Sequence, residues 1–320
     1  MKRVSNVSDQ SRSPLRIGFR VGVFPKLSET FVLNQINALM DRGHDVSILA
    51  EERPETLDPS LAQDTEAARA RTRYLKAENE LKRTLSSALP YRIRRAMEAR
   101  EERRLLSECD VVVCNFGWFG ARMFEATDDP SEHAKLVTIL HGDDMSRHLS
   151  GGNEHAYDGL VKSGGLLLSV NEIWKARLKA RGAPDHLNLI HHLGVDPSKF
   201  EFVDRDCAKD EPTVLTIVCR MVEKKGLAYA LQALHQVRTS RPDLRFEFRL
   251  YGDGPLRAEL VALAEELGID DCVHFKGSIP NAEVRTAFAN ADVFLHPSVT
   301  ADDGDMEGLP TSMMEAMATG

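Results

Sequence analysis

The chain lacks the features of a membrane or secreted protein. No apolar run reaches the roughly 20 residues of a membrane-spanning helix, and the polar first residues contain no apolar core of a signal peptide. The five cysteines form no Cys-x-x-Cys pair and their number is odd, which favours buried thiols in a reducing compartment over disulfides or a metal site. We therefore expect a cytoplasmic protein.

An excess of positive charge is also missing. The net charge is −8, so the composition predicts no nucleic-acid partner. The spacing of the eleven histidines offers no convincing set of metal ligands, and we expect neither a metal nor another cofactor. What remains is a globular chain, 42% hydrophobic and 28% charged, whose 320 residues are enough for two domains.

The first half of the chain alternates apolar, strand-like runs with helical or polar segments. Residues 16–24 and 45–50 read as strands and residues 31–40 have helical apolar spacing, which makes a βαβ unit and implies a parallel sheet. We expect residues 1–14 to be disordered and residues 15–195 to form a doubly wound α/β domain. Further strands are predicted at residues 111–114, 136–140, 166–170 and 187–190.

A second α/β series follows residues 196–212, a charged stretch that we interpret as an interdomain linker. Residues 213–320 are therefore expected to form a second domain. We expect this domain to be incomplete, because a parallel sheet should continue beyond the helix that ends the chain. Its predicted elements are strands at residues 213–219, 246–251, 272–275 and 293–296, a helix from residue 227, and a helix at residues 256–267.

The most informative stretch is DDGDMEGLPTSMMEAMATG, residues 302–320. Pro310 suits the first turn of a helix, and a helix N-terminus offers unpaired N–H groups to a phosphate. Glu307 before the turn and Glu315 inside the helix can accept hydrogen bonds from hydroxyl groups. A phosphate site flanked by two carboxylates suits a nucleotide-sugar, although the bare spacing also fits a helix with two solvated carboxylates.

This stretch resembles the donor-site signature of the retaining GT-B glycosyltransferases of family 4 (glycosyl transferases group 1), in the branch of colanic-acid and amylovoran exopolysaccharide biosynthesis. The resemblance implies two Rossmann-like α/β domains that face each other across a cleft. It also implies a nucleoside-diphosphate sugar in the second domain and an exopolysaccharide or lipid-linked oligosaccharide acceptor in the first. A non-catalytic nucleotide-sugar-binding fragment and a GT-B UDP-sugar epimerase are the alternatives.

The resemblance also implies roles for single residues. Glu307 would hold hydroxyls of the donor sugar and Glu315 those of the ribose, while His141, in LHGDDMS, would reach the sugar near the transferred carbon. Arg220 and Lys225, in CRMVEKKG, would neutralise the departing diphosphate. The predicted catalytic residues are His141, Glu307, Arg220 and Lys225; the donor site adds Gly252, Ile279, Gly308, Leu309, Thr311 and Glu315; the acceptor side has Ser28, Glu29, Thr30 and Asp144.

Structural alternatives stay open for several of these residues. Arg220 and Lys225 also fit a solvated basic loop, which is what we expect of Lys224. A histidine at the carboxyl end of a strand, such as His141, is often structural. Ser28 could serve only as a helix cap.

A basic region at residues 69–104 contains twelve Lys or Arg and five Glu, interleaved with apolar residues. One interpretation is a solvated pair of helices. The functional interpretation is an amphipathic surface for an anionic membrane leaflet, close to a lipid-linked acceptor. In that case the protein would be peripheral at the inner face of the cell membrane.

Overall fold

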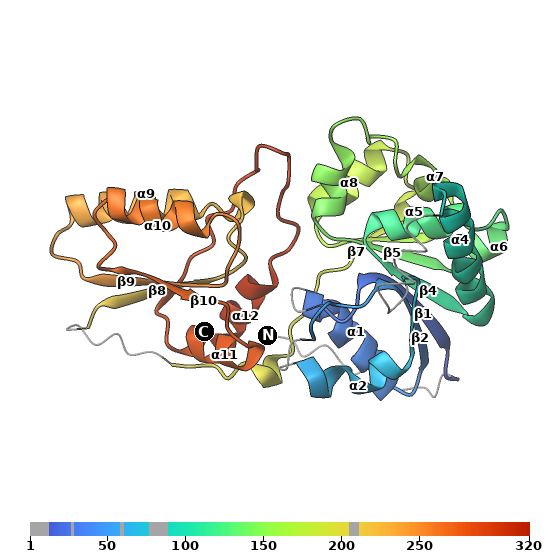
Figure 1. Ribbon diagram of the computed structural model, residues 1–320, viewed down its shortest axis with the longest axis horizontal. Helices are drawn as coiled ribbons and strands as arrows, with labels where there is room; N and C mark the ends of the chain where they lie inside the picture. Colours follow the sequence, from blue (N-terminus) through green and yellow to red (C-terminus); the bar gives the residue numbers. More distant parts are fainter. Residues whose placement is uncertain (1–12, 27–28, 58–60, 77–88, 205–210) are drawn as a thin grey trace. The chain divides into compact units, whose positions relative to one another are not determined.

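The computed structural model describes residues 13–26, 29–57, 61–76, 89–204 and 211–320. They form two compact units (Figure 1). The second unit consists of residues 190–320 together with residues 141–155 and 169–174, which follow two strands of the first sheet. Most of the N-terminus for which we predict disorder, residues 1–12, lies outside the described residues.

The first sheet has seven strands in the order β3-β2-β1-β4-β5-β6-β7. The pairs of β1 with β2 and β4, of β2 with β3 and of β4 with β5 are parallel. In such sheets, ligands bind beyond the carboxyl ends of the strands. The strands are β1 (Arg16–Val23), β2 (Asp45–Glu52), β3 (Thr72–Tyr74), β4 (Val111–Asn115), β5 (Leu136–Leu140), β6 (Leu166–Ser169) and β7 (Asn188–Ile190).

Alternate residues of β1 face two different layers of helices. Ile17, Phe19 and Val21 join the buried cluster that includes residues of α1 (Thr30–Asp41) and α2 (Ala62–Ala70). On the other face, a Cβ at Gly18 would lie 3.0 Å from Leu105. Helices therefore cover both faces, which is the predicted doubly wound arrangement. The other helices that follow strands of this sheet are α4 (Tyr91–Glu108), α5 (Gly117–Glu125), α6 (Pro130–His133), α7 (Asp158–Lys162) and α8 (Glu172–Ala180).

A buried ion pair joins α4 to this sheet. Arg20 of β1 places its Nε 3.2 Å from Oε1 of Glu102, and neither side chain is exposed. Arg95, about two helical turns earlier on the same face of α4, contacts the other carboxylate oxygen at 2.6 Å. Burial lowers the pKa of Arg20, and the charge of Glu102 opposes that shift. Because an unpaired buried charge is costly, this contact ties the helix to one place on the strand.

The second sheet has four strands in the order β10-β9-β8-β11, all in parallel pairs. Helices α9 and α10 contribute to the buried cluster on one face, and α11 and α12 to the cluster on the other (Figure 1). The strands are β8 (Thr213–Val218), β9 (Phe246–Tyr251), β10 (Val273–Gly277) and β11 (Val293–Phe294). The helices are α9 (Leu227–Ser240), α10 (Arg257–Glu266), α11 (Asn281–Ala289) and α12 (Thr311–Thr319).

The predicted strands of both halves are present, whereas β3 was not predicted. Its three residues are all partly exposed and lie among charged residues, so they carry no apolar signal. Among the described residues, no helix combines the length and apolar character that crossing a membrane requires. The cysteines in the described part of the chain are free thiols, as predicted: Cys109, Cys114, Cys219 and Cys272.

Candidate functional site

Lys225 and Glu307, 82 residues apart in the chain, are in direct contact in the second unit. Their Nζ and Oε1 atoms lie 2.7 Å apart, and the side chains are only 14% and 17% exposed. Lys225 belongs to the loop that follows β8, and Glu307 lies on the turn before α12. The structure therefore brings together one cation and one carboxylate that the sequence analysis assigned to the same donor site.

The loop after β8 is held in place by the segment after β11. Gly226 ends the short 3-10 turn η7 (Glu223–Lys225) in the left-handed region, and a Cβ there would lie 2.1 Å from the Pro297 carbonyl oxygen. Only glycine allows both this conformation and this approach. The Val299 N–H donates to the Lys224 carbonyl at 3.0 Å. These contacts fix the backbone from which Lys225 projects.

Two more basic residues of the loop after β8, Arg220 and Lys224, were the subject of predictions. Arg220 follows β8 on the same loop and is exposed, and its side chain forms no hydrogen bond or ion pair with the other described residues. Lys224 was expected to be solvated, and this is wrong. Its Nζ lies 3.1 Å from the Asp305 carboxylate, and its side chain is only 20% exposed. The acidic residue that binds it is far along the chain, so the local sequence did not reveal it.

The turn that carries Glu307 packs directly on the loop that begins with His141. A Cβ at Gly308 would lie 1.8 Å from the His141 carbonyl oxygen, and a Cβ at Gly142 would lie 3.2 Å from the Gly308 nitrogen. Two glycines thus permit close contact between the backbones of the two segments. His141 and Glu307, both predicted to be catalytic, belong to neighbouring segments of one unit.

His141 itself is buried and neutral near pH 7. Desolvation, with a smaller contribution from the charge of His191, lowers its pKa to about 3. The Trp174 Nε1–H donates to the His141 carbonyl at 2.6 Å. A neutral imidazole can donate or accept a hydrogen bond but contributes no positive charge at this position.

Asp144, predicted on the acceptor side, is fully buried within the same loop. Its Oδ1 accepts hydrogen bonds from the backbone N–H groups of His141 at 3.0 Å and Gly142 at 2.9 Å. The carboxylate therefore shapes the backbone that carries His141. A role toward the acceptor stays a prediction.

Asn171 and Trp174 complete the surroundings of the turn and were not predicted. The Asn171 side chain donates to the Gly308 carbonyl at 2.8 Å, and its oxygen accepts from the Trp174 N–H at 2.8 Å. Asn171 caps α8 from the carboxyl end of β6. The sequence did contain a signal for Asn171, which directly follows a predicted strand and precedes a helical stretch. Loops at the carboxyl ends of strands carry ligand sites.

Helix α12 places the remaining residues of the predicted donor turn. Thr311 is its first residue and Pro310 directly precedes it, with Leu309 partly buried in the turn. Glu315 lies on the second turn of the helix and is partly buried. Burial raises its pKa, and the charge of Arg285 opposes the shift. The ribose-binding role of Glu315 stays a prediction.

Gly252 and Ile279 occupy packed positions near these loops. A Cβ at Gly252, whose φ is 117°, would lie 1.9 Å from the Cys219 carbonyl oxygen, so glycine is required at the end of β9. Ile279 packs against the buried cluster that contains Phe288 and Ala316. Both residues lie beside elements of the donor half, and their contact with a donor stays a prediction.

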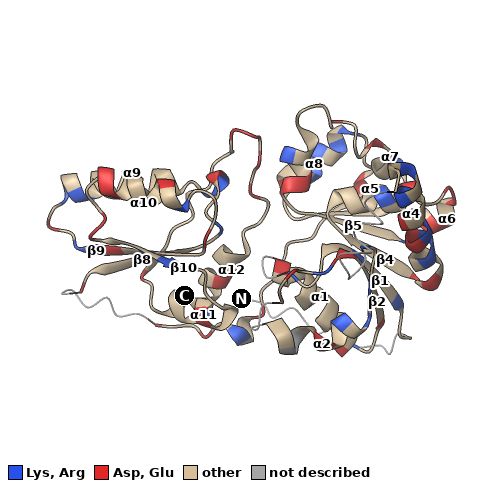
Figure 2. Cartoon of the chain, in the orientation of Figure 1, with Lys and Arg blue, Asp and Glu red and all other residues tan. Residues whose placement is uncertain are grey.

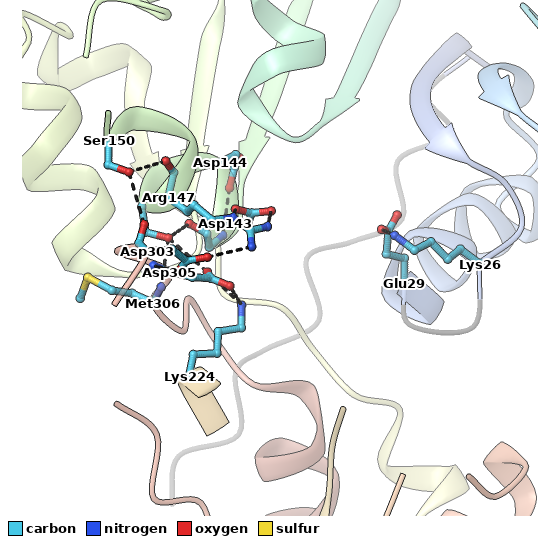
Figure 3. Close-up of polar contacts among 12 residues, drawn as sticks. Lys26, Glu29, Asp143, Asp144, Arg147, Ser150, Lys224, Asp303, Asp305 and Met306 are labelled. Atoms are coloured by element: carbon cyan, nitrogen blue, oxygen red, sulfur yellow. Dashed lines mark hydrogen bonds and ion pairs between the residues drawn. The ribbon is translucent and has the colours of Figure 1, made fainter. Parts of the chain in front are cut away.

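The predicted acceptor loop lies in the first unit. Ser28 falls outside the described residues. Glu29 forms an ion pair with Lys26 (Figure 3), and Thr30 is the first residue of α1. Their roles toward an acceptor stay predictions.

The basic region at residues 69–104 contains β3 and the first part of α4, while residues 77–88 lie outside the described part. Figure 2 shows basic and acidic residues along α4. Its second half buries Glu102, Leu105 and Leu106. Its first half instead exposes Tyr91 and Met97, by 72% and 59%.

Comparisons with known proteins relate this chain to glycosyltransferases. Residues 199–320 match the family model described as glycosyl transferases group 1. The chain is 32% identical over 332 residues to the amylovoran biosynthesis glycosyltransferase AmsK of Erwinia amylovora, covering 96% of this chain and 81% of the relative. It is 33% identical over 331 residues, with the same coverage, to WcaL of Salmonella typhimurium, a protein assigned to colanic acid biosynthesis.

Solved structures resemble the chain as well. The structure of Anabaena HepE in complex with UDP has a TM-score of 0.69 at 18% identity, and covers 95% of this chain and 78% of its own. The lipopolysaccharide outer core galactosyltransferase WaaB, in its apo form, has a TM-score of 0.65 at 18% identity with the same coverage. At this level of identity the likeness concerns the fold alone.

Proposed function

The chain belongs to the group 1 glycosyltransferases, and from this premise we propose that it moves a sugar, with retention of configuration, from a nucleoside-diphosphate sugar to an exopolysaccharide or lipid-linked oligosaccharide precursor. Its α/β fold with parallel sheets is the GT-B fold expected from the sequence. The acceptor class is proposed from the names of two relatives, which refer to amylovoran and to colanic acid biosynthesis.

The observation that carries the proposal is the contact of Lys225 with Glu307 beside the His141 loop. A diphosphate at the loop after β8 would share Lys225 and the exposed Arg220. Glu307, in contact with Lys225, would then accept hydrogen bonds from hydroxyls of the attached sugar. The diphosphate of such a donor would contact Lys225 and its sugar would contact Glu307, and these two residues are already adjacent.

The chemical contribution of these side chains is positioning and charge stabilisation. Negative charge grows on the diphosphate as the glycosidic bond breaks, and fixed cations at Arg220 and Lys225 stabilise it. The leaving phosphate can accept the proton of the incoming hydroxyl on the same face of the sugar, which gives retention without a protein nucleophile. His141, being neutral, would contribute a hydrogen bond near the transferred carbon.

We propose that the reaction requires no metal ion, because Arg220 and Lys225 supply the positive charge that the leaving group needs. Glycosyl transfer should then continue in the presence of a chelator such as EDTA. Loss of transfer in EDTA and recovery with a divalent cation would overturn this part of the proposal.

A finer part of the proposal concerns a membrane surface. Tyr91, Ile93 and Met97 are exposed on the first half of α4, and Arg92 and Arg94 are exposed beside them. Exposed apolar residues next to cations suit the boundary of an anionic leaflet. We propose that this exposed first half of α4 brings the enzyme to a lipid-linked acceptor.

The experiment that tests the activity is a screen of UDP- and GDP-sugars for release of the nucleoside diphosphate, with and without a lipid-linked glycan. Acceptor-dependent release together with a retained anomeric configuration in the product supports the proposal. Nucleotide binding without release would indicate a non-catalytic binder. Inversion of a sugar centre without an acceptor would indicate an epimerase.

A further inference from the structure

Asp305 is almost fully buried where three segments of the second unit meet. Its Oδ1 accepts a hydrogen bond from Lys224 Nζ at 3.1 Å (Figure 3). The same oxygen lies 3.4 Å from the Ser146 hydroxyl. Lys224 comes from the loop after β8, and Ser146 from the loop after β5. The Asp305 carboxylate thus connects both loops to the segment that leads into Glu307.

Ser146 extends this connection in both directions. Its hydroxyl donates to the Gly142 carbonyl at 2.8 Å and accepts from the Met306 N–H at 3.1 Å. Because a hydroxyl has a single hydrogen, the shorter bond to Gly142 is the main one, and Asp305 is a weaker second acceptor. The residue next to His141 and the residue next to Glu307 are therefore joined through one buried oxygen.

Asp305 also gives Lys224 a carboxylate partner different from that of the neighbouring Lys225. Lys224 pairs with Asp305 and Lys225 pairs with Glu307, and all four side chains are 20% exposed or less. At such partly buried positions, charges interact more strongly than in water. Without the Asp305 charge, Lys224 would become a second cation close to the Lys225–Glu307 pair.

We propose that Asp305 is a positioning residue for glycosyl transfer. By binding Lys224 and Ser146, it keeps Glu307 on Lys225 and keeps the Glu307–Gly308 turn against the His141 loop. A displacement of about 1 Å at a reacting centre can cost ~100-fold in rate. Loss of Asp305 should therefore lower kcat more than nucleotide affinity, which in the proposed function depends on Arg220, Lys225 and α12. The inference rests on that proposed function.

The test is Asp305→Asn, which removes the charge and keeps the shape. We expect kcat to fall by at least ~10-fold, while the Kd of the nucleoside diphosphate, measured by calorimetry with UDP and GDP, changes by less than ~3-fold. The control is Asp303→Asn on the same loop. Asp303 is half exposed and pairs with Arg147, and its Oδ1 accepts the Asp305 N–H at 3.0 Å, a bond that the asparagine oxygen can still accept. The substitution should therefore change kcat by less than ~2-fold.

A double variant distinguishes positioning from a purely structural role. In Lys224→Met/Asp305→Asn the unpaired cation is absent, so kcat should recover part of the loss seen in Asp305→Asn alone. The inference would be overturned if the double variant lost kcat by the product of the losses of its two single variants. A wild-type kcat in Asp305→Asn would also overturn it, as would parallel losses of kcat, nucleotide affinity and stability in that variant. If the wild-type chain releases no nucleoside diphosphate from any donor, the proposed function fails and the inference fails with it. If the wild type is active and Asp305→Asn matches it, only the inference fails.

Discussion

Gly308 approaches the carbonyl oxygen of His141 so closely that a Cβ on Gly308 would lie 1.8 Å from it. The two residues are 167 positions apart, and each belongs to a segment that the sequence analysis assigned to the reaction. The contact is backbone against backbone, so no flexible side chain can move aside to relieve a clash. Glycine at position 308 is therefore a geometric requirement of this site.

The first prediction follows from that contact. Gly308→Ala should displace the turn that carries Glu307 and lower kcat/KM by ~100-fold, because a shift of about 1 Å at a reacting centre is enough for such a loss. Steady-state kinetics with the active donor measure it. The matched control is Gly194→Ala, since a Cβ at Gly194 meets nothing within 4 Å. Equal activity of the two variants would contradict the assignment.

A second prediction concerns the pH dependence of stability. The pKa of His141 in the folded protein is about 3, below its ordinary value of 6.5. As pH falls below about 6.5 the unfolded chain binds a proton that the folded chain does not, so this group destabilises the fold progressively toward pH 3. His141→Asn should make the free energy of unfolding less steep in this window, by up to about 1.4 kcal/mol per pH unit.

Urea unfolding at a series of pH values tests this prediction. His155→Asn, which removes an exposed imidazole, is the control. A His141→Asn variant with the wild-type slope would show that His141 is not buried as a neutral group.

A third prediction concerns the buried pair of β1 and α4. Glu102→Gln leaves Arg20 buried without its carboxylate, and should lower the free energy of unfolding by about 3–5 kcal/mol. Glu101→Gln on the same helix is the control, because Glu101 is partly exposed and should change stability by less than about 0.5 kcal/mol. Chemical denaturation measures both. Similar values for the two variants would argue against a stabilising role for the pair.

A fourth prediction concerns the exposed half of α4. Arg92→Glu/Arg94→Glu should weaken binding to vesicles that contain anionic lipid, since each cation near such a surface contributes about 1 kcal/mol. Arg95 is left unchanged because it pairs with Glu102. Arg241→Glu/Lys276→Glu, with the same change of charge in the second unit, is the control. Vesicle sedimentation in which both double variants bind as the wild type does would remove the membrane proposal.

The sequence predicted the sheets because their strands are apolar runs, and it predicted the neighbourhood of Glu307 because the motif is contiguous. It could not predict contacts between residues with no local signature. Asn171 reaches the Gly308 carbonyl across 137 positions. Lys224 was expected in solvent because its carboxylate partner, Asp305, lies on a loop whose path the local sequence does not determine.

The most direct test of the account compares the binding of a nucleotide-sugar with that of its bare nucleoside diphosphate by calorimetry, in the wild type, Lys225→Met and Glu307→Gln. We expect Lys225→Met to weaken both ligands by at least ~10-fold, since it removes a charge-assisted contact to phosphate. Glu307→Gln should retain the affinity for the diphosphate and weaken only the additional binding due to the sugar. Wild-type binding of both ligands by both variants would contradict a shared donor site at the Lys225–Glu307 contact.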